Sequence, residues 1–213
     1  MYDMLRQLTE TGMTLSAKSE TTRATIIGRA LEMASQHGLE ALTMGTLADS
    51  MKMSKSGVVA RVGSREALQL AVLTDYQRRF EAQVLTPAAG HPPGLPRLRL
   101  LFDLSLRQVS LGGTAGCFHI SCAAEYDDRL GILRHAVSSA IEAWRSAFDS
   151  SARQAVALGQ LAPELDVGQL VFEIYAVLLA TQHDIRLLQH GDSAERARRA
   201  FERVLAARVK QVC

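Results

Sequence analysis

Aromatic residues are scarce in this chain: Phe, Trp and Tyr together make up only 5% of 213 residues. Stretches in which β-branched residues alternate with polar ones are also rare, although such alternation is typical of a half-buried β-strand. With 47% hydrophobic and 22% charged residues, the chain has enough apolar material for one or two cores. The two absences together predict an all-α fold.

Long apolar runs are missing as well. No run reaches the roughly 18 residues that a membrane-spanning helix needs, so no membrane partner is expected. The first residues do not form a signal peptide, because Asp3, Arg6 and Glu10 interrupt any apolar core. Cysteines number three, which is an odd count for a chain without a secretion signal. These features indicate a protein of the reducing cytoplasm.

The sequence patterns of the common enzyme classes are also absent. Paired carboxylates, a Ser-His-Asp set, a P-loop and a dinucleotide fingerprint are not found. Residues 112–116 (GGTAG) lack both the preceding strand and the Lys-Ser/Thr pair that a P-loop requires. Glu125, Asp127 and Asp128 cluster at the expected end of a helix, where solvent exposure is the simpler interpretation. We therefore expect no catalytic residue, no cofactor and no enzyme.

One set of metal-binding residue types is present, at Cys117, His119 and Cys122. Thiolate and imidazole suit zinc, but positions 117 and 122 lie about 140° apart around a helix. No metal site is therefore predicted. Two readings of the cysteines remain, as small buried hydrophobic residues or as redox-sensing thiols, and the first is favoured.

Residues 43–68 (TMGTLADSMKMSKSGVVARVGSREAL) carry the most specific pattern in the chain. Leu47, Ala48 and Met51 share one helical face, and Thr43 is placed to cap that helix. Residues 51–53 interrupt the pattern, and Ser54 can cap a second short helix. A third cap candidate follows at Ser64. Two short helices around a tight turn predict a helix-turn-helix, which places its second helix in the major groove of DNA.

The second of these helices has two distinct faces. The positions expected to point to the core are Val58, Val59 and Val62. The positions expected to point outward at its first turn are Lys55, Ser56 and Gly57. A short solvated helical bundle would show the same pattern, so the arrangement alone does not establish DNA binding.

Basic charge is concentrated on this segment. Between Thr43 and Arg65 there are four basic residues and one acidic residue, a net charge of +3, whereas the whole chain carries +2. Neutralised phosphates release counterions, so basic charge gathered on one segment favours nucleic-acid binding there. The basic residues are Lys52, Lys55, Arg61 and Arg65.

Residues 22–68 resemble the N-terminal DNA-binding domain of the TetR family of bacterial transcriptional regulators. The first helix of that family begins with Thr-Arg and ends in Gly, as TTRATIIGRALEMASQHG does here. Its second helix is opened by Thr and carries an Ile/Leu-Ala pair, here Leu47-Ala48. Its recognition segment, Val-Ser-Lys-Gly-Thr-Leu-Tyr-x-His-Phe, aligns with residues 53–62, and Ser-Lys-Glu-x-Leu aligns with residues 64–68.

The resemblance implies binding to a double-stranded DNA operator by this segment. The expected DNA-binding residues are Thr43, Gly45, Lys52, Ser54, Lys55, Ser56, Gly57, Arg61 and Arg65.

The chain departs from the family pattern within the recognition helix. Val59 replaces a Tyr and cannot hydrogen-bond to a phosphate, whereas Arg61 replaces a His and still can. Val62 stands at the usual core Phe, and Gly57 costs about 1 kcal/mol relative to Ala in a helix. We therefore hypothesise a frayed recognition helix with weakened or relaxed operator binding.

A second resemblance lies further along the chain. Gly116-Cys117-Phe118, followed by AAEYDD, is similar to a C-terminal ligand-binding domain of one TetR subgroup. It implies a small-molecule effector bound among the helices after Leu95. Helix position and apolar character predict a pocket for a hydrophobic or aromatic effector, lined by Phe102, Leu106, Phe118, Cys122, Trp144 and Tyr175.

Two amphipathic helices are expected at the end of the chain, over about residues 166–190 and 193–211. Together they have more apolar surface than one small domain needs, and the family uses such a pair for a four-helix dimer interface. A helix-turn-helix protein also needs two half-sites about 34 Å apart. A homodimer through the last two helices is expected on both grounds.

Four of the five prolines lie in PAAGHPPGLP, residues 87–96, which predicts a loop after a long fourth helix. The expected domains are a mobile N-terminal arm (1–20), a three-helix DNA-binding domain (21–75) and a helical effector-binding and dimerisation domain (76–213). Met13 is an alternative first residue, since MTLSAKSETTR is similar to a short leader of this family.

The sequence thus predicts a ligand-responsive, homodimeric transcriptional regulator, with a repressor favoured. The alternative is an interaction protein that responds to a ligand or to thiol redox state and whose DNA binding is weakened.

Overall fold

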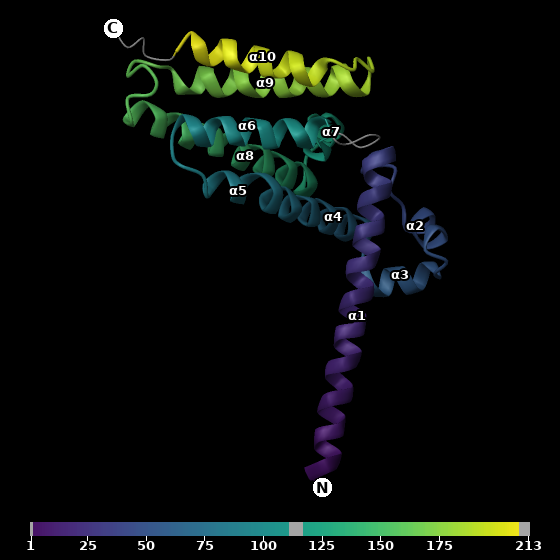
Figure 1. The fold of residues 1–213 in the computed structure, drawn as a ribbon. Coiled ribbons are helices and arrows are strands. Elements are labelled where there is room, and N and C mark those ends of the chain that lie inside the picture. Colours follow the sequence, from purple (N-terminus) through teal and green to yellow (C-terminus); the bar gives the residue numbers. More distant parts are fainter. Residues whose placement is uncertain (1, 111–116, 209–213) are drawn as a thin grey trace. The chain divides into compact units, whose positions relative to one another are not determined.

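The computed structural model describes residues 2–110 and 117–208, with side chains from Glu20 onward. Within these ranges all regular elements are helical, which confirms the predicted all-α fold (Figure 1). No helix of the described chain is both long and apolar enough to cross a membrane. The predicted mobile arm covers residues 1–20, whose side chains lie outside the described part of the chain, apart from that of Glu20.

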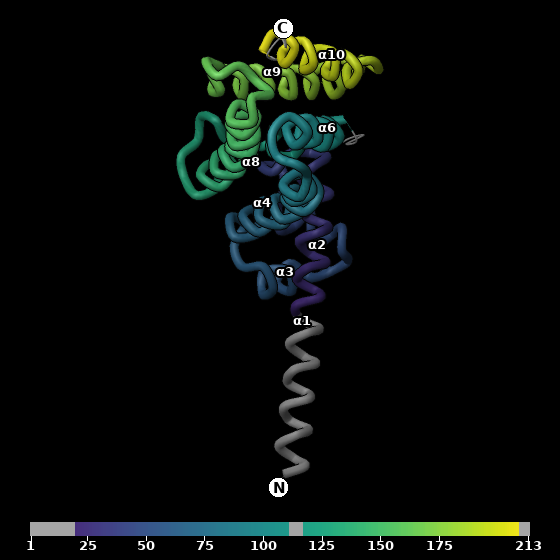
Figure 2. The backbone as a smooth tube through the Cα atoms, turned by 60° about the vertical axis from the view of Figure 1, so that its left-hand side comes forward, coloured from purple at the N-terminus to yellow at the C-terminus, as the bar shows by residue number. Residues whose placement is uncertain are grey.

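The chain divides into two compact units, Met1–Asp75 and Tyr76–Cys213. The first contains α1 (Tyr2–His37), α2 (Met44–Ser50), α3 (Lys55–Val62) and the beginning of α4 (Arg65–Phe80). Figure 2 shows α2 and α3 beside the described part of α1. Side chains from each of these helices and from the α1–α2 connection are fully buried: Ile26, Ala30, Leu39, Leu47, Val58 and Leu68.

The helices α2, α3 and α4 each begin directly after a hydroxyl residue that was predicted as an N-cap. Thr43 Oγ1 accepts from the N–H of Thr46 at 3.1 Å, and Thr46 Oγ1 accepts in return from the N–H of Thr43 at 3.3 Å. Ser54 Oγ accepts from the Gly57 N–H and Ser64 Oγ from the Ala67 N–H, both at 3.1 Å. These bonds satisfy amides of the first helical turn, so all three predicted N-caps are confirmed.

The second unit begins in α4 and continues through η1 (Glu81–Leu85), α5 (Thr86–Ala89), α6 (Leu95–Ser110) and α7 (Phe118–Tyr126). It ends with α8 (Ile132–Ala157), α9 (Val167–Arg186) and α10 (Ser193–Ala206). In both views α9 and α10 lie side by side, and α6 and α8 separate them from η1 and α5 (Figures 1 and 2). Asp166 caps α9 by accepting from the Gln169 N–H at 3.0 Å.

The prediction of one proline-rich loop over residues 87–96 is wrong at both ends. Residues 86–89 form α5 with Pro87 in its first turn, and α6 begins at Leu95 with Pro96 in its first turn. Proline is tolerated in a first turn because the amides there have no partner within the helix. The connection shortens to residues 90–94, in which Gly94 adopts a φ of 85°.

Candidate functional site

The predicted tight turn between α2 and α3 contains a left-handed residue that the sequence did not reveal. Lys52 adopts a left-handed φ of 53°, a conformation usually taken by Gly. Its N–H donates to Asp49 O at 3.2 Å, and the Met53 N–H donates to Ala48 O at 2.9 Å. This Schellman pattern ends α2 sharply and lets Ser54 open α3 two residues later. A Lys in this position gives no sequence signal, because propensity favours Gly or Asn.

The nine predicted DNA-binding residues share one property, namely that none is buried. Lys55 and Ser56 are exposed on the first turn of α3, where Ser56 Oγ lies 3.2 Å from Ser54 Oγ. A Cβ at Gly57 would lie 3.0 Å from Ser54 Oγ, so a side chain there would press on the cap. The Arg61 guanidinium folds back along α3 and donates to Gly57 O at 2.8 Å.

The three valines of α3 do not all point inward as predicted. Val58 and Val62 are buried, at 0% and 6% exposure, but Val59 is 42% exposed. Val59 follows Val58 by about 100° around the axis, at an edge of the apolar face that stays exposed. Val59 therefore lies on the open face of α3, the face on which a hydroxyl could meet a phosphate.

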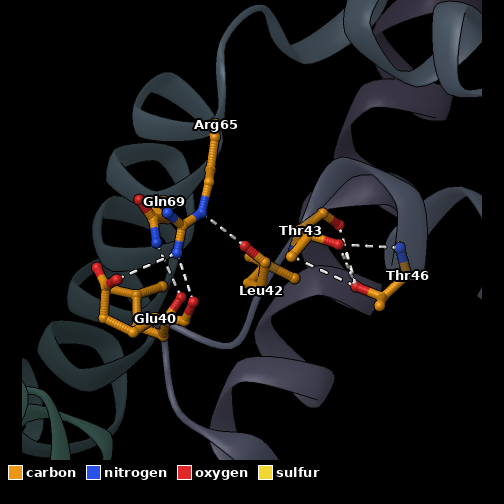
Figure 3. Close-up of polar contacts among 7 residues, drawn as sticks. Glu40, Leu42, Thr43, Thr46, Arg65 and Gln69 are labelled. Carbon is orange, nitrogen blue, oxygen red and sulfur yellow. Dashed lines mark hydrogen bonds and ion pairs between the residues drawn. The ribbon is translucent and has the colours of Figure 1, made fainter.

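Arg65 contacts the protein itself. Its guanidinium points from the first turn of α4 to the connection before α2, where it donates to Leu42 O at 3.0 Å (Figure 3). Its side chain keeps 45% of its surface exposed. The sequence placed Arg65 with the phosphate-binding cations, and the fold gives it intramolecular partners that are distant in sequence.

In the second unit the predicted effector residues lie in the interior. Phe102, Leu106, Phe118, Cys122 and Trp144 are at most 1% exposed, and Tyr175 is partly buried. Phe102 stacks on Phe201 with ring centroids 3.9 Å apart, away from the other aromatic contacts. The structure thus joins Phe118, Trp144 and Tyr175 in one set of ring contacts, from which Phe102 is separate.

Phe118, Trp144 and Tyr175 belong to one continuous set of edge-to-face contacts, which we call the aromatic cluster. Its members are Tyr76, Phe80, Phe118, His119, Trp144 and Tyr175. The centroids of neighbouring rings lie 4.6 to 5.5 Å apart, within the range in which edge-to-face pairs stabilise a core. Sequence reasoning missed Tyr76 and Phe80, because they were assigned to a linking helix.

His119 is the unusual member of the aromatic cluster. It is fully buried, and neither ring nitrogen has a hydrogen-bond partner among the described residues. Burial in this apolar surrounding lowers the pKa of His119 to about 4. The imidazole is therefore neutral near pH 7, with one donor and one acceptor nitrogen left unused. From the sequence, His119 was considered only as a metal ligand, and no metal site was predicted there; the described residues contain no group of ligands suited to a metal ion.

The start of α7 is held from two sides by polar side chains. The Tyr76 hydroxyl accepts from the Phe118 N–H at 3.2 Å and donates to Cys117 Sγ at 3.7 Å. Gln182 on α9 accepts from the Cys117 N–H at 2.8 Å and donates to Cys117 O at 3.3 Å. Burial raises the pKa of both the Cys117 and the Cys122 thiol. Both thiols thus stay protonated, which disfavours redox reactivity.

A cavity of ≈ 140 Å³ lies elsewhere in this unit, between α7 and α8. It has mostly apolar walls, formed by Ala123, Tyr126, Asp127, Arg134, Val137, Ser138 and Ile141. None of the six predicted effector residues lines it.

The comparisons with known proteins agree with this arrangement. The family model of the tetracyclin repressor-like C-terminal domain matches residues 94–201, just over half of the chain. A TetR-family transcriptional regulator from Cytophaga hutchinsonii superimposes with a TM-score of 0.79 at 18% identity, over 92% of this chain and 98% of that one. A TetR transcriptional regulator from Chloroflexus aurantiacus J-10-FL gives a TM-score of 0.79 at 20% identity, over 91% and 100%.

A third similar structure is AibR in complex with isovaleryl coenzyme A and operator DNA. It has 20% identity and a TM-score of 0.67, over 85% of this chain and 95% of that one. No curated protein matches the sequence. The fold, the exposed helix-turn-helix and the matched C-terminal domain define a ligand-responsive DNA-binding regulator, not an enzyme. The chain belongs to the TetR family of transcriptional regulators.

The burial of His119 makes a prediction about pH. Its pKa falls from 6.5 to about 4 on folding, so between these values the unfolded chain binds more protons than the folded chain. Stability contributed by the neutral imidazole is therefore lost as the pH drops through this window. Between pH 6.5 and pH 4, the free energy of unfolding of the wild type should fall by about 2–3 kcal/mol more than that of His119→Phe.

Urea unfolding of both proteins across this pH range measures the difference. His119→Phe keeps an aromatic ring against Tyr76 and Phe80, so any packing cost it introduces is the same at each pH. Parallel curves for the two proteins would contradict the burial of an unpartnered imidazole.

Proposed function

We propose that this chain is a homodimeric repressor that leaves its DNA operator when a small hydrophobic or aromatic effector binds in the second unit. The observation that carries the proposal is the aromatic cluster. Its members Tyr76 and Phe80 lie on α4, the helix that begins with Arg65 beside the helix-turn-helix. A ligand that displaces aromatic rings of the cluster therefore acts directly on α4.

The proposed DNA surface comprises the exposed first turn of α3 and the turn before it. Lys52 and Lys55 supply charge, and Arg61 supplies a guanidinium on the following turn. The hydroxyls and small residues Thr43, Gly45, Ser54, Ser56 and Gly57 let the backbone approach the groove closely. AibR, whose fold is similar, forms a complex with operator DNA, which supports this assignment.

The composition of the aromatic cluster supports an effector with apolar or aromatic character. His119 also favours an effector with a polar group, because its two buried ring nitrogens have no hydrogen-bond partner among the described residues. An unsatisfied buried polar group costs roughly 1–3 kcal/mol, so a ligand that hydrogen-bonds to His119 gains this energy only in the bound state. An effector shifts an equilibrium by its differential affinity for the two states, and this bond is one source of the difference.

The proposed dimer forms through α9 and α10. Three large apolar side chains on α9 or directly after it remain exposed within one chain, namely Phe172 at 58%, Leu187 at 72% and Leu188 at 54%. Large apolar side chains left exposed along one helix favour a protein interface there. An isologous interface would bury each of them twice.

DNA selection tests the regulator directly. The wild-type protein should select a sequence from a random duplex library and bind it at least ~10³-fold more tightly than random DNA. This affinity should fall steeply with salt, because bound phosphates release counterions. Some small apolar or aromatic compounds should release the selected duplex. Weak and equal binding to selected and random DNA would instead favour an interaction protein with weakened DNA binding.

Val59→Tyr tests whether the departure from the family pattern weakens binding. Val59 is 42% exposed on the open face of α3, so the larger side chain should fit without loss of stability. One new hydrogen bond to a phosphate should increase affinity about tenfold at fixed salt. Val59→Phe adds the ring without the hydroxyl and serves as the control. Equal affinities of the wild type and both variants would refute weakened binding at this position.

Phe172→Glu tests the dimer. A carboxylate placed twice in an apolar isologous interface should dissociate the dimer, because neither charge has a partner. Sedimentation velocity should then show a monomer, and affinity for the selected duplex should drop about 100-fold through lost bivalency. Leu158→Glu is the control, since Leu158 is similarly exposed (55%) but lies after α8. A dimeric Phe172→Glu protein would show that the interface lies elsewhere.

A further inference from the structure

The connection between α1 and α2 has its backbone carbonyls held by two side chains of α4 (Figure 3). Arg65 Nε donates to Leu42 O at 3.0 Å, while Arg65 Nη2 donates to Glu40 O and, at 3.2 Å, to Glu40 Oε2. Gln69 Nε2 donates to Leu39 O at 2.9 Å. We call this set of contacts the α4 clamp. It holds three carbonyls within four residues of chain.

The two donors of the α4 clamp lie on the same face of α4, because Arg65 and Gln69 are four residues apart. Gln69 is only 3% exposed, so its amide bonds to Leu39 O away from competing water. The side chains of Leu39 and Leu42 are buried at 0% and 2%. The connection is thus fixed on one side by apolar packing and on the other by hydrogen bonds.

The position of this connection matters because it leads directly into the helix-turn-helix. Leu42, whose carbonyl accepts from Arg65, is followed by Thr43, the N-cap of α2. The capping bonds between Thr43 and Thr46 connect Leu42 to α2, and the hydrogen bonds of the tight turn at Lys52 connect α2 to α3. A continuous set of hydrogen-bonded residues therefore links Arg65 to α2 and α3.

We propose that Arg65 and Gln69 are positioning residues that fix the orientation of α2 and α3 for DNA binding, and that Arg65 does not bind a phosphate. This inference rests on the proposed DNA-binding function and changes the role that the sequence gave to Arg65. Two of the guanidinium nitrogens already donate to protein oxygens, and Glu40 neutralises the charge. Lys52, Lys55 and Arg61 remain as the proposed cations for phosphates.

The salt dependence of DNA binding separates positioning from phosphate contact. Each phosphate contact contributes about 0.9 to the slope of log affinity against log salt. The probe is the duplex that the wild type selects from a random library. Arg65→Gln, which removes the charge, and Gln69→Leu, which removes no charge, should both lower affinity about tenfold at every salt concentration with the slope unchanged. Lys55→Gln is the control and should reduce the slope by about 0.9.

Arg65→Lys distinguishes the two roles, because positioning predicts a loss of DNA affinity whereas phosphate contact predicts that affinity is kept. Lys retains the charge that a phosphate would need, but its single ammonium cannot reproduce the fork to Leu42 O and Glu40 O. Positioning therefore predicts the same tenfold loss as Arg65→Gln. Rescue of affinity by Lys, or a slope reduced by about 0.9 in Arg65→Gln, would overturn the proposal.

Amide hydrogen exchange tests the α4 clamp without DNA. In Arg65→Gln and Gln69→Leu, exchange at the N–H of Thr46 and its neighbours in α2 should accelerate at least about tenfold, while exchange in α8 stays unchanged. Unchanged exchange in α2 would overturn the α4 clamp even if DNA affinity fell. A wild-type protein that selects no duplex would contradict the proposed DNA-binding function, and exchange alone would then decide on the clamp.

Discussion

The structure depends on the contacts made by α4, a helix with residues in both units. Its first turns bond to backbone carbonyls before α2 through Arg65 and Gln69. Its last turn places Tyr76 and Phe80 among buried rings of the second unit. The two sets of contacts, one in each unit, therefore involve side chains of the same helix. This shared helix supports the proposed coupling between an effector and DNA binding.

The two ends of α4 are stabilised by different kinds of interaction. In the first unit, polar side chains bond to backbone carbonyls, and such bonds fix direction and distance. In the second unit, aromatic rings pack edge to face around an imidazole that has no hydrogen-bond partner among the described residues.

The protonated state of the two buried thiols bears on whether these cysteines sense redox state or have a structural role. Cys117 and Cys122 are fully buried, and their raised pKa leaves little thiolate to react with an oxidant. Cys117 instead helps to hold the start of α7, through Tyr76 and Gln182. A structural role for these residues is therefore favoured over redox sensing.

Short-range chemistry determined much of the fold from sequence alone. The caps at Thr43, Ser54 and Ser64 were predictable because a hydroxyl three residues before a free amide needs only local geometry. Helical periodicity likewise located the helix-turn-helix and the final helix pair. Periodicity was misleading at Val59, because the helices packed against α3 decide which edge of its apolar face is covered.

Only the tertiary structure decided which side chains meet across long sequence separations. Arg65 was a phosphate ligand by charge and motif, but the fold places it against carbonyls 23 and 25 residues away. Tyr76, Phe80 and His119 showed no common pattern, yet packing joins them to Trp144 in one buried cluster. The sequence determined helices and caps because those depend on neighbours within a few residues. Long-range partners and the burial of His119 depend on how whole helices pack, and no local pattern specifies that.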